Sequence, residues 1–120
     1  MPTKIVQEEI KQDEIVFCAL RLETKNANML LLSEGEDQLG TLAVALPPAE
    51  KMLGPPISSV LLGDRNTIIA RLLAERLAQK TGKIALASVF AKAVDEQNAG
   101  RVFLQLFEKT FKEKEETKKG

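Results

Sequence analysis

Apolar residues recur with two different periods along this chain, and the change of period predicts the order of its elements. Residues 13–23, 29–33 and 40–46 are short runs rich in aliphatic side chains, separated by polar turns, which predicts three strands in an antiparallel meander. A looser alternation over residues 4–11 predicts an edge strand. Residues 57–62 and 84–90 are two more apolar runs. The pattern therefore indicates five or six strands.

The stretch between the last two strands has helical spacing. We predict a helix over residues 66–80, with an apolar stripe that includes Ile69, Leu72, Leu73 and Leu77. Either Asp64 or Asn66 can cap its N-terminus, and Gly82 suits a left-handed C-terminal cap. A second helix is predicted to begin near Gln97, and its apolar face would consist of Val102, Phe103, Leu106, Phe107 and Phe111.

These elements indicate an α/β (α+β) fold, with a mostly antiparallel five- to six-stranded sheet and two main helices. The length of 120 residues favours one domain, which we place at residues 1–112. Residues 113–120 are mainly Glu and Lys without an apolar anchor, and we expect a charged, frayed C-terminal tail. The segment between Pro47 and Pro56 is expected to be a loop or a single helical turn.

The central strands are apolar at both odd and even positions, so both faces of the sheet are expected to be covered. Two helices can cover one face, and the economical cover for the other is a second sheet in a dimer. The residues that we assign to this dimer face are Phe17, Leu42, Val44 and Leu86. The alternative is a monomer in which the loop and the helices are divided between the two faces.

Composition excludes several kinds of chemistry. The chain has no His and a single cysteine, Cys18, so the commonest general base and the usual metal ligands are missing, and we expect no catalytic residue, metal or cofactor. Seventeen basic residues balance seventeen acidic ones, which gives no support for nucleic acid as a partner. No segment approaches the roughly 20 apolar residues of a membrane span, and the charged N-terminus does not resemble a signal peptide. We expect a cytoplasmic protein with no membrane partner.

The turn after residue 62 invites a phosphate-binding interpretation, but the glycine spacing is wrong. Gly63 is followed by Asp64 and by no Gly-x-Gly-x-x-Gly or Gly-Lys-Ser/Thr motif. The fragment Thr81-Gly82-Lys83 lies at the end of the predicted helix, where the helix dipole repels anions. A turn with a helix cap is the better interpretation.

The amino-acid sequence of residues 57–90 is similar to that of a known family. Two segments resemble the proteasome assembly chaperone 3/4 family, and their sequence is most similar to that of chaperone 4. They are Ser59-Val60-Leu61-Leu62-Gly63-Asp64 and the helical run Leu73-Ala74-Glu75-Arg76-Leu77-Ala78-Gln79-Lys80-Thr81-Gly82-Lys83. The Gly40-Thr41-Leu42 strand also resembles chaperone 3. The similarity in amino-acid sequence covers about a quarter of the chain, while the order of strands and helices agrees over most of it.

This resemblance implies a non-catalytic chaperone that dimerises through its sheet, with itself or with a related subunit, and binds proteasome α-subunits transiently while the α-ring assembles. It transfers no binding residues by position. From exposure alone, we expect the partner surface on the outer face of the first helix and on the nearby loop, at Lys51, Arg65, Arg71, Glu75 and Gln79. Two rivals are a roadblock- or longin-like dimeric scaffold that binds a small GTPase, and a small hydrolase or ligand-binding domain.

Overall fold

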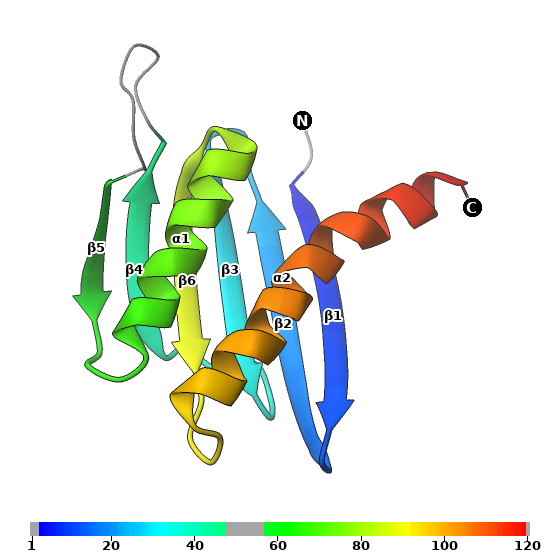
Figure 1. The fold of residues 1–120 in the computed structure, drawn as a ribbon. Coiled ribbons are helices and arrows are strands. Elements are labelled where there is room, and N and C mark those ends of the chain that lie inside the picture. The colour runs from blue at the N-terminus through cyan, green and yellow to red at the C-terminus, as the bar shows by residue number, and fades with distance from the viewer. Residues whose placement is uncertain (1–2, 48–56, 120) are drawn as a thin grey trace.

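The computed structural model describes residues 3–47 and 57–119, which form six strands and two helices (Figure 1). The predicted mixed α+β fold with a mostly antiparallel sheet is confirmed. Lys51 and the predicted turn between Pro47 and Pro56 lie outside the described residues. In chain order the elements are β1 (Lys4–Gln12), β2 (Ile15–Glu23), β3 (Ala27–Glu34), β4 (Thr41–Leu46), β5 (Ile57–Leu62), α1 (Thr67–Thr81), β6 (Ile84–Phe90) and α2 (Glu96–Lys119).

The strand order in the sheet is β1-β2-β3-β6-β4-β5. The first three strands form an antiparallel meander, but β4 does not follow β3 as predicted, because β6 lies between them and runs parallel to β3. The connection from β3 to β4 crosses the end of β6 at Gly40, where a Cβ atom would lie 2.2 Å from the Val89 carbonyl oxygen. Only glycine can pass so close to the backbone of β6.

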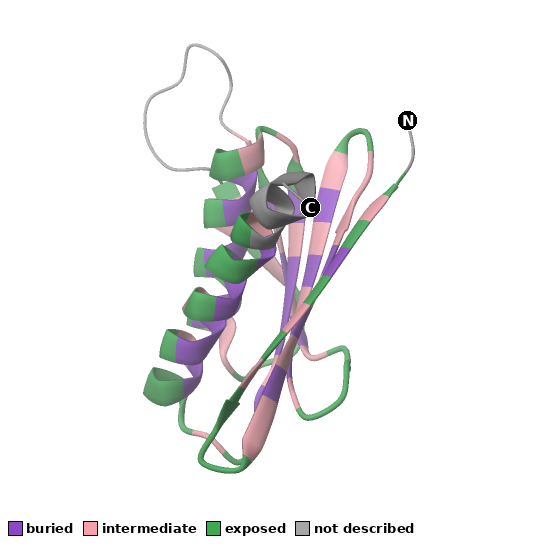
Figure 2. Cartoon of the chain, turned by 90° about the vertical axis from the view of Figure 1, so that its right-hand side faces the viewer, coloured by how far each residue is buried: buried purple, intermediate pink, exposed green. Residues whose placement is uncertain are grey.

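Both helices lie on the same face of the sheet (Figures 1 and 2). α1 packs on β4, β5 and β6, and α2 packs on β1 and β2. The sheet is therefore covered by helices on one side only, and the alternative in which the helices divide between its two faces does not hold. We call the face without helices the open face.

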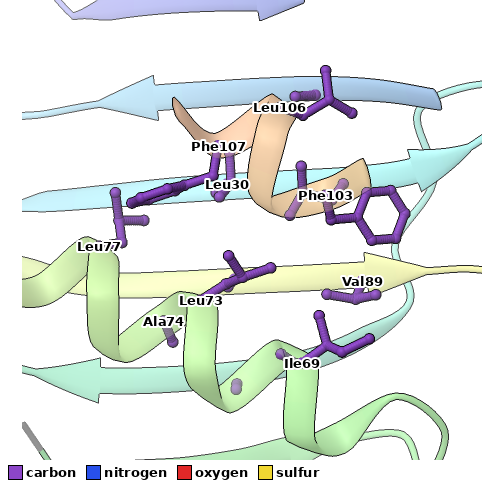
Figure 3. Close-up of a cluster of buried hydrophobic side chains, with 14 of the residues drawn as sticks. Leu30, Ile69, Leu73, Ala74, Leu77, Val89, Phe103, Leu106 and Phe107 are labelled. Atoms are coloured by element: carbon purple, nitrogen blue, oxygen red, sulfur yellow. The ribbon is translucent and has the colours of Figure 1, made fainter. Parts of the chain in front are cut away.

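The core lies between the helices and the sheet, where side chains from α1 and α2 meet over β3 and β6 (Figure 3). Alanines of α1 and β6 allow close approach, while Leu73, Leu77 and Phe103 supply the volume. The Phe17 ring packs edge-on against Phe103, with 5.8 Å between the ring centroids and 82° between their planes. Phe17 is 2% exposed in this core, so its assignment to the dimer face was wrong. In β2 the odd-numbered residues face the helices, and the even-numbered ones lie on the open face.

The helix ends differ in part from their predictions. Gly82 closes α1 in the left-handed conformation and donates its N–H to the Ala78 carbonyl, as expected. At the N-cap position Asn66 has a φ of 60° and its side chain makes no capping hydrogen bond, so the expected side-chain cap by Asn66 is wrong. α2 spans Glu96–Lys119 and so includes residues 113–119, and the fraying of this charged end stays a prediction.

Glu34, at the end of β3, holds the connection between β6 and α2. Its carboxylate accepts hydrogen bonds from the N–H groups of Lys92, Ala93 and Val94 at 2.8, 3.1 and 3.3 Å. Burial alone would raise the pKa of Glu34, but these three hydrogen bonds and the charge of Lys92 outweigh it and lower the pKa below its ordinary value. The ionised carboxylate therefore positions the start of α2.

Glu34→Gln is expected to lower the free energy of unfolding by about 1 kcal/mol at pH 7, the typical loss for a side-chain cap of free N–H groups. Because the pKa of Glu34 is lower in the folded than in the unfolded protein, its stabilisation is present above pH 4.5 and is lost as the pH falls below that value. Urea unfolding at pH 7 and near pH 3 should show the difference between wild type and variant shrinking at low pH. Glu36→Gln, exposed in the same turn, is the control. A difference that does not change with pH would contradict this role.

Candidate interaction surfaces

The open face of the sheet is mostly apolar, with Ser33, Ser59 and Ser88 as polar positions on the same face. It is built by the alternating residues of the central strands that point away from the helices, and neighbouring strands continue it in register, as Val44 opposite Leu86 and Leu20 opposite Leu31 illustrate. Its central members are all half-buried: Val16, Cys18, Leu20, Leu22, Met29, Leu31, Leu42, Val44 and Leu86. At one edge it continues into Leu46 and Ile57, which are paired in register and are 50% and 69% exposed.

Three of the four residues assigned to the dimer face from sequence, Leu42, Val44 and Leu86, lie on this open face. An apolar surface that extends over most of a sheet is larger than soluble monomers usually leave in water. A sheet with helices on one face and an apolar surface on the other has the form of one layer of a β-sandwich.

The outer face of α1 carries the residues that the sequence suggested for partner binding. Arg65 is exposed just before the helix, and Gln79 is exposed near its end. The Ser58 hydroxyl of β5 donates a hydrogen bond to the Glu75 carboxylate, and it accepts one from Arg71 Nε at 3.1 Å. Arg71 and Glu75 thus connect α1 to β5, which gives both a structural role.

Sequence reasoning missed two apolar residues on this outer face. Ile68 is 73% exposed and Leu72 is 38% exposed, although Leu72 was expected to lie in the buried stripe of the helix. The buried side of α1 is instead formed by Ile69, Ala70, Leu73, Ala74, Leu77 and Ala78. Small alanine side chains bring the helix close to the sheet and turn Leu72 outward. Helical spacing alone gave no signal for this, because Ile68 lies four residues before Leu72, a member of the expected stripe.

A buried arginine was also missed. Arg21 is fully buried on the helix side of β2 and donates hydrogen bonds to Asn28 Oδ1 at 2.8 Å, to the Glu23 carboxylate at 3.2 Å and to the Thr110 carbonyl at 3.3 Å. Its guanidinium lies 4.1 Å from the ring centroid of Phe111. These contacts fasten α2 to the sheet. The signal in the sequence was that Arg21, like Phe17, is an odd-numbered residue of β2, so the two side chains lie on the same face of the strand.

A hollow of about 440 Å³ beside β1 is the best candidate for small-molecule chemistry. Cys18, Glu9 and Asp37 line it together with Lys109. Burial, and then the negative charges of Asp37 and Glu9, raise the pKa of the Cys18 thiol. A thiol held protonated is a poor nucleophile, so the hollow does not favour catalysis by cysteine.

Two further features bear on the kind of site. Among the residues that the structure describes, no group of three or more His, Cys, Asp or Glu side chains is arranged to hold a metal ion. Within the same residues, no helix has the length and apolar character needed to span a membrane. The surfaces that remain prominent are the open face and the outer face of α1.

Comparison with known proteins agrees with this architecture. Among solved structures, a chaperone complex for yeast 20S proteasome assembly contains a chain with the same fold, at a TM-score of 0.67 and 13% identity over 93% of this chain and 94% of that one. At such low identity the likeness establishes the fold alone. A sequence search of curated proteins finds no match. The family model described as proteasome assembly chaperone 4 matches residues 14–89, from the first residues before β2 almost to the end of β6. Since this match spans more than half of the sequence, the chain belongs to the proteasome assembly chaperone 4 family.

Proposed function

We propose that this protein is a non-catalytic chaperone that binds α-subunits of the proteasome core transiently while the α-ring assembles. The observation that carries the proposal is the family match over residues 14–89, which gives the chain a role in proteasome assembly. The absence of His from the whole sequence and the protonated Cys18 thiol agree with a role that depends on binding. The proposal needs no cofactor, nucleic acid or membrane, and it places the protein in the cytoplasm.

The proposal includes a dimer formed through the open face. Stacking a second sheet on it, about 10 Å away, would remove the half-buried leucines and valines from water and leave the helices outside. The second sheet would come from another copy of this chain or from a related chaperone subunit. In either case the outer face of α1 lies on the opposite side from the dimer interface and stays accessible to a client (Figure 2).

The test is direct binding to separately produced proteasome subunits. The purified chain, alone and after co-expression with any related chaperone subunit of the same host, would be mixed with each α-subunit and each β-subunit and examined by size-exclusion chromatography with light scattering. We expect a complex with at least one α-subunit, none with β-subunits, and none with the completed core particle. If no α-subunit is bound, or if the chain stays on the mature core, the proposed function is wrong.

A further inference from the structure

The cationic side chains of α1 have no acidic partners in the described part of the chain. Ion pairs among the described residues involve Arg21, Lys83 and Lys109, all of them away from the outer face of α1. By contrast, four cationic residues in or just before α1 form none: Arg65, Arg71, Arg76 and Lys80. The one acid of the helix, Glu75, is engaged by the Ser58 hydroxyl. Lys80 lies over the Phe111 ring of α2, 5.0 Å from its centroid, and Arg71 donates to Ser58. The charged residues that remain at the outer side of this segment are Arg65 and Arg76, with Asp64 exposed beside Arg65.

The two exposed apolar residues of α1 lie between these cations. Ile68, Leu72 and Arg76 follow one another at spacings of four residues, which places them in one stripe along α1. Arg65 is exposed and precedes the helix, which begins at Thr67 after Asn66 in the left-handed conformation. We call these four residues, with Gln79 at their end, the α1 ridge. Ile68 is 73% exposed, so the ridge presents an apolar contact that continues through Leu72 to Arg76 and is preceded in the chain by Arg65.

Two turns of the sheet carry four exposed acidic side chains. The turn between β1 and β2 carries Asp13 and Glu14, and the turn between β3 and β4 carries Glu36 and Asp37; all four are exposed. Within α1 itself Glu75 is the one acid, so the helix carries more positive than negative charge, while Asp64 is exposed just before it. An excess of cations on the helix favours an acidic partner at α1.

We infer that the α1 ridge is the contact for the client, and that it fits an acidic protein surface with a shallow apolar hollow for Ile68 and Leu72. The inference rests on the proposed function, because it takes the client to be a proteasome α-subunit. The apolar centre favours a protein over a nucleic acid, whose phosphates would need cations but no exposed isoleucine. The ridge is one helix face with a small apolar anchor, which suits a complex that must dissociate when assembly advances.

The inference predicts that apolar and charge changes in the ridge weaken client binding by different routes. Ile68→Ser is expected to raise the Kd for the bound α-subunit about tenfold or more, as truncation of a central anchor does. Arg76→Glu is expected to raise it several-fold, mainly through slower association, and to reduce the salt dependence of binding. Kd and association rates would be measured by biolayer interferometry at low and at physiological salt.

Matched controls keep this test specific. Ile68→Leu retains the apolar contact, and Arg101→Glu makes the same charge reversal on the exposed side of α2; each should change the Kd by less than about twofold, as surface changes outside a contact do. All variants change exposed side chains, and thermal unfolding would verify that they are folded.

If wild type binds an α-subunit and the ridge variants bind equally well, the ridge is not the contact, while the proposed function stands. If Arg76→Glu weakens binding and Ile68→Ser does not, the ridge is merely a cationic patch and the apolar hollow is wrong. If wild type binds no α-subunit, the proposed function fails and the inference fails with it.

Discussion

Val44→Glu is expected to separate the proposed dimer into folded monomers. Val44 lies in the middle of β4 on the open face, with Leu86 of β6 and Ser59 of β5 as its register partners. In a monomer the new carboxylate would be in contact with water, so the protomer should fold. Between two stacked sheets it would be buried without a cation, which costs several kcal/mol per chain. Light scattering should show the mass falling from that of two chains to the 13.2 kDa of one.

A matched variant separates this effect from a general effect of charge. Gln105→Glu adds the same carboxylate on the exposed side of α2, and it should leave the mass of two chains unchanged. If the partner is a related subunit, the same comparison would be made on the co-expressed pair. The stacked-sheet dimer is contradicted if the Val44 variant keeps the wild-type mass, or if wild type is already a monomer at micromolar concentration both alone and with its related subunit.

Arg21→Ala is expected to lower the free energy of unfolding by about 3 kcal/mol, the loss that follows when one member of a buried charged network is removed. The substitution leaves the Asn28 amide oxygen and the Thr110 carbonyl without the donor that now serves them. It also removes the guanidinium that stacks on Phe111 and opens a cavity under α2. Urea unfolding at a fixed protein concentration measures the change, because a dimer would make stability depend on concentration.

Arg21→Met distinguishes the packing contribution from the charge. Methionine fills most of the same volume without hydrogen bonds, so we expect a smaller loss, of about 1–2 kcal/mol. Arg21 Nε and Asn28 Nδ2 already lack hydrogen-bond partners in the described structure, so the wild-type network is itself incompletely satisfied. An alanine variant as stable as wild type would show that the arginine does not hold α2 in place.

Much of the fold follows from local patterns that a sequence displays directly. The strand–helix–strand order of residues 57–90 depends on neighbouring residues only: two short apolar runs, helical spacing between them, and Gly82 at the helix end. These features predicted β5, α1 and β6 within about one residue at each boundary. The family resemblance depended on the same segment, since that segment combines turn, helix and strand residues at fixed spacing.

The place of β6 between β3 and β4 could not be predicted in this way. Strand pairing joins residues far apart in the sequence, as with Ala27 and Ile84, and the pairing energy depends on the final arrangement of the whole sheet. The face on which Phe17 lies was equally undetermined, because β2 is apolar at both parities. Only the position of α2, with Phe103 against Phe17, decides which parity is the core.

For the open face and the outer face of α1, too, the sequence determined one part of the result and the tertiary structure the other. The sequence by itself determined that the sheet has more apolar surface than two helices can cover. This follows from the apolar residues at both odd and even positions of the central strands. It also indicated α1 as an outward-facing helix with charged positions. The tertiary structure alone decided that both helices share one face and that Arg71 and Glu75 are engaged by Ser58. It also decided that Ile68 and Leu72 are exposed on the same helix face as Arg76, which forms no ion pair with the residues that the structure describes. Exposure and pairing depend on how the elements pack on one another, and helical spacing alone does not contain that information.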